Sequence, residues 1–210
     1  MESLTETISS KLALYIGENT NKSGEELEVL KYGIFIFMHI FIAVVFTFIF
    51  GLITNTLFEI LIISLIGGLM KRCCGGVHSS SPNRCIITGI IVSYGFSLIG
   101  KNIININGHI IYLIVGLMLI HSFFIIYKKC PVPSKNKPLK KEETRKKLRK
   151  KAFKNFFICT IGFILSMFYT NLNYLAICMV LGLYMQSISL TAIGTKVILL
   201  IDKLLIKVRV

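Results

Sequence analysis

Long apolar segments, separated by short polar ones, make up most of the chain from residue 32 onward. Six of these segments are predicted to be helices, at about 32–54, 57–70, 85–100, 109–127, 153–169 and 173–190. Four of them approach the roughly 20 residues that a helix needs to cross a hydrocarbon core about 30 Å thick. The second and third are short, so either those helices extend into the 71–84 connection or that connection enters the membrane.

An amphipathic helix is predicted ahead of the first apolar segment. Within residues 3–16, Leu4, Ile8 and Leu12 recur at helical spacing among polar residues. Such a helix would lie at the membrane surface. Residues 1–31 also lack the basic stretch, apolar core and cleavage site of a secretory signal peptide, so none is expected. The predicted fold class is an all-α polytopic membrane protein with about six transmembrane helices and an N-terminal amphipathic interfacial helix.

A single integral membrane domain is expected to cover residues 1–210. Its parts are an N-terminal amphipathic segment (1–31), four spans that include a loop at 71–85 (32–127), a basic cytoplasmic loop (128–152), and two spans with a C-terminal segment (153–210). The tail from Ile193 is apolar with lysines spaced through it. It is expected either to lie at the interface or to extend the sixth span.

Composition and charge favour a membrane location. Apolar residues make up 54% of the chain and charged residues only 16%, against roughly 45–50% and about 25% in soluble domains. Thirteen of the 24 basic residues fall between Lys128 and Lys154. One block of charge between apolar segments is unlike a basic folded surface, so no nucleic acid is expected as a partner. Anionic membrane lipid is the expected contact of this block.

The distribution of Lys and Arg among the connections predicts the orientation. Basic residues gather at 71–84, at 128–152 and after 191, and they are rare near 55, at 101–108 and at 170–173. With six spans these two sets alternate across the membrane. The rule that basic loops stay inside then places both termini and the 71–84 connection in the cytoplasm.

The residues that could carry out chemistry lie at the end of the 71–84 connection. Ser81 followed by Pro82 is typical of a helix start, which places Cys85 in the first turn of the third apolar helix. The partial positive charge of a helix N-terminus and the neighbouring Arg84 both stabilise a thiolate. Cys85 is therefore a candidate nucleophile.

A histidine lies within possible reach of this thiol. His78 precedes Cys85 by seven residues and follows Gly75-Gly76, whose backbone freedom would let the loop fold back. An imidazole beside a thiol is the minimum apparatus of a cysteine nucleophile.

The residues alone leave other interpretations open. Cys73, Cys74, His78 and Cys85 are residue types that bind zinc, although adjacent cysteines are less usual than a C-x-x-C pair. The Cys and His could also be incidental. In that case a small transporter or channel is the alternative function, although the repeated halves typical of transporters are not seen.

Residues 75–85, Gly-Gly-Val-His-Ser-Ser-Ser-Pro-Asn-Arg-Cys, resemble the signature of the accessory gene regulator B family. That signature has an Arg, a Gly-rich entry, a His, and a Cys seven residues after the His. The matching positions are Arg72, Gly75, Gly76, His78 and Cys85. The chain also resembles the family in its length, its several spans, its N-terminal amphipathic helix and its basic loop.

The family consists of bacterial cell-membrane endopeptidases that process the precursors of autoinducing peptides. The resemblance implies that Cys85 attacks a short precursor with His78 as its base and expels an acidic C-terminal tail. The remainder would then cyclise from a thioester on Cys85. Arg72, Gly75, Gly76 and Arg84 would support the loop or orient the substrate, and Asn83 or a serine at 79–81 would orient His78. No cofactor or metal is implied, and a homodimer is left open.

The basic loop has two expected contacts. The residues concerned are Lys146, Lys147, Arg149, Lys150 and Lys151. They are expected to bind either the acidic tail of the precursor or anionic lipid, to which each basic side chain adds about 1 kcal/mol near the surface.

Overall fold

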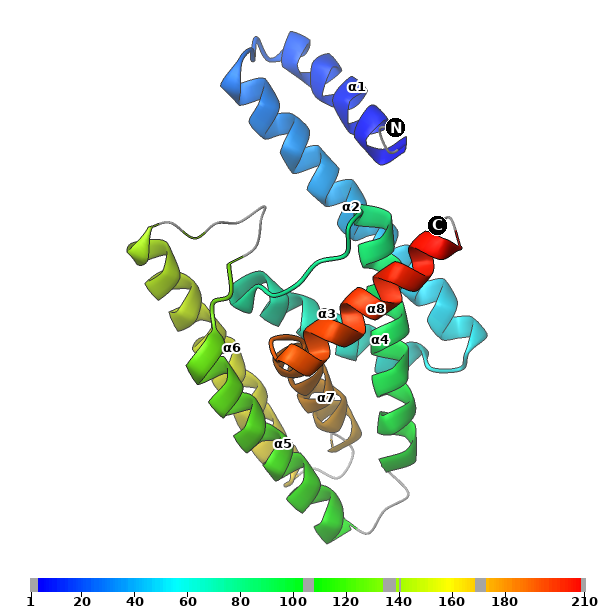
Figure 1. The fold of residues 1–210 in the computed structure, drawn as a ribbon, viewed down its shortest axis with the longest axis vertical. Coiled ribbons are helices and arrows are strands. Elements are labelled where there is room, and N and C mark those ends of the chain that lie inside the picture. The colour runs from blue at the N-terminus through cyan, green and yellow to red at the C-terminus, as the bar shows by residue number, and fades with distance from the viewer. Residues whose placement is uncertain (1–3, 104–107, 134–138, 140, 169–172, 209–210) are drawn as a thin grey trace. The chain divides into compact units, whose positions relative to one another are not determined.

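The computed structural model describes residues 4–103, 108–133, 139, 141–168 and 173–208. Within them the chain forms helices α1 (Leu4–Asn19), α2 (Glu25–Ile53), α3 (Leu57–Cys74), α4 (Pro82–Ile103), α5 (Gly108–Lys129), α6 (Glu142–Ser166), α7 (Asn173–Ser189) and α8 (Ala192–Lys207), shown in Figure 1. Parts of the expected connections at 101–108, 128–152 and 170–173 lie outside the described residues, which omit 104–107, 134–138, 140 and 169–172 as well as 1–3 and 209–210. The all-α prediction is confirmed for the described part.

The chain divides into two compact units, Met1–Ile49 and Phe50–Val210. In the first unit, α1 runs beyond its predicted end at residue 16. A Cβ at Gly17 would lie 2.7 Å from Leu27 Cδ1 of α2, so the two helices approach closely there. The helix ends three residues later than Ile16, and Asn21 then turns the chain with a φ of 52°.

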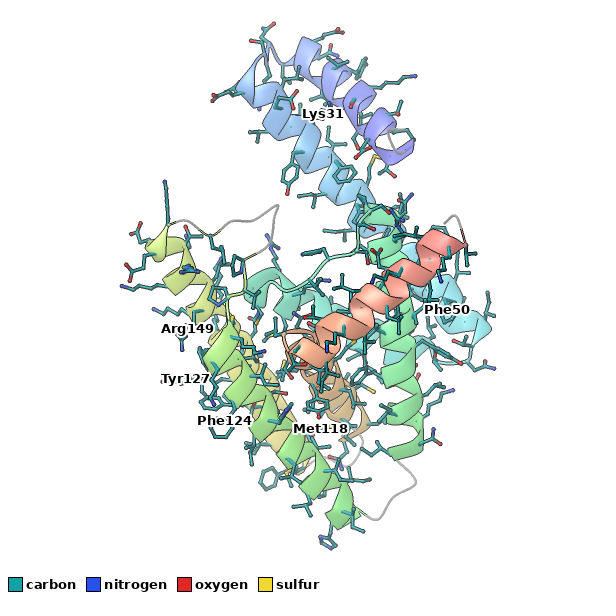
Figure 2. The ribbon with its side chains drawn as sticks, in the orientation of Figure 1. Lys31, Phe50, Met118, Phe124, Tyr127 and Arg149 are labelled. Atoms are coloured by element: carbon teal, nitrogen blue, oxygen red, sulfur yellow. The ribbon has the colours of Figure 1, made fainter. Side chains whose placement is uncertain are left out.

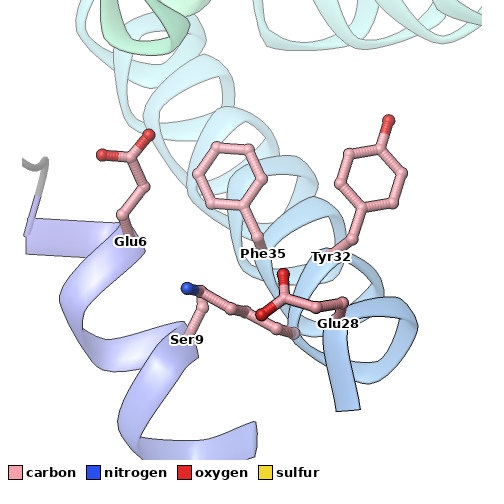
Figure 3. Close-up of a pocket in the computed structure, with 6 residues that line it drawn as sticks. Glu6, Ser9, Glu28, Tyr32 and Phe35 are labelled. Atoms are coloured by element: carbon pink, nitrogen blue, oxygen red, sulfur yellow. The ribbon is translucent and has the colours of Figure 1, made fainter. Parts of the chain in front are cut away.

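A small cavity of about 160 Å³ lies between α1 and α2 in this unit. Figure 3 shows that Glu6 and Ser9 of α1 face Glu28, Tyr32 and Phe35 of α2. Three apolar side chains of the amphipathic pattern of α1 remain exposed. Ile8, Leu12 and Tyr15 expose 40%, 46% and 67% of their surface.

Helix α7 is the centre of the second unit, as Figure 1 shows. It packs against α3, α4, α5, α6 and α8. Because neighbours surround it, its side chains from Ala176 to Leu183 are almost all fully buried. Its crossing with α3 is tight: a Cβ on Gly182 would lie 2.7 Å from the carbonyl oxygen of Ile63. Small residues at a helix crossing are typical of packing in membranes.

All six predicted apolar segments are helical in their described parts, but six spans are not confirmed. In the part of the chain that the structure describes, three helices (α2, α4 and α5) are long and apolar enough to cross a membrane, and the bent pair of α7 and α8 makes a fourth if it counts as one span. Helix α3 carries Glu59, Lys71 and Arg72, and the first half of α6 is basic. Those charges distinguish both helices from the three clear spans. Large apolar side chains cover much of the outer surface, as expected for a protein in contact with lipid.

The structure decides the two questions that the sequence left open about helix ends. Helices α3 and α4 both extend into the 71–84 connection, which leaves only residues 75–81 outside a helix. At 1.5 Å per residue their 18 and 22 residues span about 27 Å and 33 Å. At the other end, α8 is a separate helix, bent 88° from α7 rather than extending it.

The basic loop predicted at 128–152 is helical at both of its ends. Helix α5 continues to Lys129, and α6 begins at Glu142 and runs without a break into the next apolar segment. Lys146 pairs with Glu142 at 3.0 Å, as the i,i+4 spacing favours. The lysines of this region therefore project from a helix.

Candidate active site

The start of α4 fixes the backbone of the candidate nucleophile. Pro82 is the first helical residue, where its missing N–H costs nothing. Ser81 precedes it and acts as the cap, since its Oγ accepts a hydrogen bond from the Arg84 N–H at 3.3 Å. The Ser81 carbonyl accepts from the Cys85 N–H at 3.0 Å. Cys85 thus lies in the first turn of α4, as predicted.

The loop from α3 brings the predicted histidine to this thiol. Nδ1 of His78 lies 3.9 Å from Sγ of Cys85. This is a long hydrogen bond, as catalytic contacts often are before substrate binds. His78 is exposed, and Cys85 is partly exposed, so both can be reached from outside the protein.

The electrostatic setting of the imidazole favours its neutral form. Partial burial lowers the pKa of His78 below its usual value of 6.5, and the positive charge of Lys71 lowers it further. A neutral imidazole at neutral pH can accept a proton from the thiol, whereas an imidazolium cannot. The geometry and the charge together allow general-base chemistry at Cys85.

Two glycines form the entry to the loop, each with a positive φ. Gly75 has a φ of 72° and Gly76 a φ of 118°. Gly75 lies beside Val132, and a Cβ there would be 2.2 Å from the Val132 carbonyl oxygen. The Val132 N–H donates to the Cys74 carbonyl at 2.8 Å, and Nε2 of Gln186 donates to the Gly75 carbonyl at 3.0 Å. The start of the loop is therefore held by Val132 after α5 and by Gln186 of α7.

An aspartate that the sequence analysis missed holds the exit of the loop. Asp202 on α8 accepts a hydrogen bond from the Ser80 hydroxyl at 2.6 Å and from the Ser80 N–H at 3.2 Å. It also lies 3.8 Å from Nε of Arg84. Asp202 is the only aspartate in the chain and the only acidic residue after Glu143. A single acid in a basic, apolar tail was the pattern that could have identified it.

The three serines expected to orient His78 have other partners, and Asn83 is exposed at the start of α4. Ser79 donates to Thr88 at 3.1 Å, Ser80 binds Asp202, and Ser81 caps α4. Among the described residues, the only hydrogen bond of the His78 ring is the one to Cys85.

The other cysteines near the loop differ from Cys85 in exposure. Cys73 exposes 7% of its surface and Cys74 none. Cys73 accepts a long hydrogen bond from Nδ2 of Asn155 at 3.8 Å. Within the described ranges, no three His, Cys, Asp or Glu side chains are grouped to hold a metal ion. Arg72 lies in the last turn of α3 and is exposed.

Two of the five basic residues predicted to contact substrate or lipid have partners within the fold, Lys146 in its ion pair with Glu142 and Arg149 in contacts with α5. Figure 2 shows Arg149 beside Tyr127, and its guanidinium lies 5.1 Å from the centre of that ring. Nη2 of Arg149 also donates to the Tyr127 carbonyl at 2.8 Å, near the C-terminus of α5. The predicted lysines of this set, at 146, 147, 150 and 151, are all exposed on α6.

Comparison with known proteins identifies relatives along almost the whole chain. A family model described as "Accessory gene regulator B" matches residues 9–190. A "Putative AgrB-like protein" of Clostridium perfringens (strain SM101 / Type A) is 32% identical over 210 residues, 96% of each chain. A "Putative AgrB-like protein 2" of Clostridium perfringens (strain 13 / Type A) is 28% identical over 207 residues, 95% of this chain and 97% of the relative. No solved structure matches the chain.

Proposed function

Because this chain belongs to the accessory gene regulator B family, whose members process autoinducing-peptide precursors, we propose that it is a cysteine endopeptidase for such a precursor. Cys85 is the nucleophile and His78 its base. The observation that carries this proposal is the contact of 3.9 Å between their side chains. The neutral state of His78, favoured by its lowered pKa, supports the same roles.

The reaction begins when His78 takes the proton from the Cys85 thiol. The thiolate attacks the carbonyl carbon of the scissile peptide bond, and the carbon–nitrogen bond then breaks. His78 returns the proton to the nitrogen of the departing C-terminal tail. The rest of the precursor remains bound to Cys85 as a thioester.

Ring closure follows from the thioester. A thiol or hydroxyl within the bound peptide attacks the thioester carbonyl, forms a thiolactone or lactone, and releases the Cys85 thiol. A thioester retains acyl-transfer potential, so this step needs no nucleotide. Water would hydrolyse the intermediate, so ring closure must be faster than hydrolysis of the thioester.

The start of α4 supplies a candidate donor for the oxyanion of the tetrahedral intermediate. Pro82 has no N–H, and the N–H groups of Arg84 and Cys85 already bind Ser81. The Asn83 N–H remains as the backbone donor of this turn without a hydrogen bond among the described residues. It is the group that we assign to stabilise the oxyanion.

The remaining parts of the proposal concern topology and substrate recognition. We assign six crossings to one membrane domain, with both termini and the 75–81 loop in the cytoplasm, because basic residues lie on that side. The exposed apolar side chains on the second half of α6 support a crossing there. The exposed lysines of α6 would receive the acidic tail of the precursor or bind anionic lipid.

The test is precursor processing by cysteine variants of the full-length protein. It is co-expressed with a precursor from a neighbouring small reading frame that encodes an amphipathic leader, a Cys or Ser, and an acidic tail. Cys85→Ala and His78→Ala should abolish release of the tail. Cys73→Ala and Cys74→Ala are the matched controls and should retain most of it, because these thiols are buried away from the loop surface.

Mass spectrometry separates this mechanism from a metal-dependent one. Wild-type protein incubated with precursor should carry a peptide bound to Cys85 through a thioester, and a strong chelator should not slow tail release. Tail release by correctly inserted Cys85→Ala protein would contradict the proposal.

A further inference from the structure

The carboxylate of Asp202 is buried, and among the described residues its hydrogen-bond and ion-pair partners are Ser80 and Arg84. Its side chain is 7% exposed. The Ser80 N–H lies 3.2 Å from both carboxylate oxygens, and the Ser80 hydroxyl donates to Oδ2 at 2.6 Å. Nε of Arg84 lies 3.8 Å from Oδ1. Burial of a carboxylate is costly unless it is paired with a positive charge and hydrogen-bonded. Here Arg84 supplies the charge and Ser80 the hydrogen bonds.

The residues that Asp202 binds are close to the two candidate catalytic residues. Ser80 follows His78 by two residues, and Arg84 directly precedes Cys85. Arg84 also donates from Nε to the Ser81 Oγ at 3.0 Å, so the same guanidinium links the carboxylate to the cap of α4. A loop tied at these points has less freedom to carry His78 away from the thiol.

Helix α8 holds the carboxylate at a fixed place. Thr191 caps α8 by accepting a hydrogen bond from the Gly194 N–H at 3.1 Å. A Cβ at Gly194 would lie 2.1 Å from the Ile188 carbonyl oxygen, so α8 leaves α7 through a tight corner. Ile198 and Asp202, one helical turn apart, are buried, whereas Lys203 is exposed. Asp202 therefore reaches the loop from a helix anchored on the centre of the bundle.

We propose that Asp202 is a positioning residue, which holds the 78–85 segment so that His78 stays aligned with Cys85. The inference rests on the proposed function of that pair. Asp202 lies beyond residues 9–190, the part of the chain that the family model matches. In this role α8 does not contact the substrate; it acts through Ser80 and Arg84. Loss of the carboxylate should lower the population of the aligned pair and leave substrate binding unchanged.

The first measurement needs no substrate. Full-length protein in lipid nanodiscs is treated with iodoacetamide, and alkylation of Cys85 is followed by peptide mass spectrometry. Asp202→Asn should slow this alkylation by about tenfold to a hundredfold, the range expected when hydrogen bonds to a charged group are lost. His78→Ala gives the rate of Cys85 alkylation in the absence of the base. Asp202→Glu keeps the charge and should restore part of the rate, and Lys203→Gln, an exposed neighbour on α8, should leave it unchanged.

A second variant removes the loop's side of the contact between Ser80 and Asp202. Ser80→Ala removes only the 2.6 Å bond and should slow alkylation less than Asp202→Asn does. Combining the two should be no slower than Asp202→Asn alone, because both act through one contact. If Asp202→Asn does not fold, a Ser80→Ala protein with wild-type melting temperature and wild-type alkylation overturns the proposal. Additive effects of the two substitutions also overturn it.

Kinetics with the precursor separate positioning from substrate contact. Asp202→Asn should lower kcat and leave KM unchanged. A raised KM with unchanged kcat would overturn positioning in favour of substrate binding. A wild-type protein that does not cleave the precursor refutes the proposed function, whereas alkylation of Cys85 still decides whether Asp202 positions the loop.

Discussion

Substitution of Gly75 by Ala should break the entry to the loop, and the structure gives the size of the effect. The backbone of Gly75 has a φ of 72° and a ψ of −144°, a region occupied almost only by glycine. A residue held there costs on the order of 1–3 kcal/mol. The new Cβ would also lie 2.2 Å from the Val132 carbonyl oxygen, which is backbone and must move.

That movement would also disturb the neighbouring hydrogen bond. The Val132 N–H donates to the Cys74 carbonyl at 2.8 Å, and such a bond contributes about 1 kcal/mol. Strain and the lost bond together predict a destabilisation of about 2–4 kcal/mol. At about 2–4 °C per kcal/mol for a chain of this size, the melting temperature should fall by about 4–16 °C.

The matched control is a glycine of the preceding helix. Gly68 in α3 is exposed, and a Cβ there would meet no atom within 4 Å. Gly68→Ala should therefore be neutral or stabilise the protein by up to about 1 kcal/mol, as alanine does in a helix interior.

The assay is thermal unfolding of both variants in the same detergent, followed by precursor cleavage. Gly75→Ala should melt earlier and cleave more slowly, while Gly68→Ala should match or exceed wild type in stability. The reasoning is refuted if Gly75→Ala melts within a degree of wild type.

Three further predictions follow from the same structure. Lys71→Gln removes a positive charge that lowers the pKa of His78, so this pKa should rise. The acid limb of the pH profile of kcat/KM should then move to higher pH, and an unmoved limb would show that His78 is not the base. Neutralising the lysines at 146, 147, 150 and 151 together should raise KM and flatten its salt dependence with kcat nearly kept, and an unchanged KM would assign them to lipid or topology alone. Single-cysteine reporters in residues 75–81 and 142–152 should resist a membrane-impermeant thiol reagent in intact cells, whereas labelling from outside would invert the proposed orientation.

Helix positions and the location of the candidate site were predictable from the sequence because both depend on local chemistry. A long apolar stretch in a membrane forms a helix because its backbone polar groups must pair within the segment. Ser81-Pro82 begins a helix through its own side chain and ring. Cys85 was therefore correctly placed in the first turn of α4. Helix ends were harder to predict, since α1 continues past Gly17 to Asn19 although a glycine commonly ends a helix.

The number of spans could not be settled by counting apolar residues. Helices α3 and α6 carry charges that lower their mean hydropathy, and their apolar parts gain burial from α7. The bend between α7 and α8 follows from the close approach of Gly194 to the Ile188 carbonyl. A close contact of this kind is a property of the folded chain and leaves little trace in hydrophobic periodicity.

The sequence by itself determined which residues belong to the candidate site, since Gly75, Gly76, His78 and Cys85 lie within eleven residues of one another. Only the tertiary structure decided what holds them. Val132, Gln186 and Asp202 come from segments about 55 to 125 residues away, and their contacts exist because α7 brings α3, α4 and α8 together. A carboxylate or an amide looks the same in sequence whether it faces water or binds a loop, because its partner is chosen by packing across the bundle and not by its neighbours along the chain.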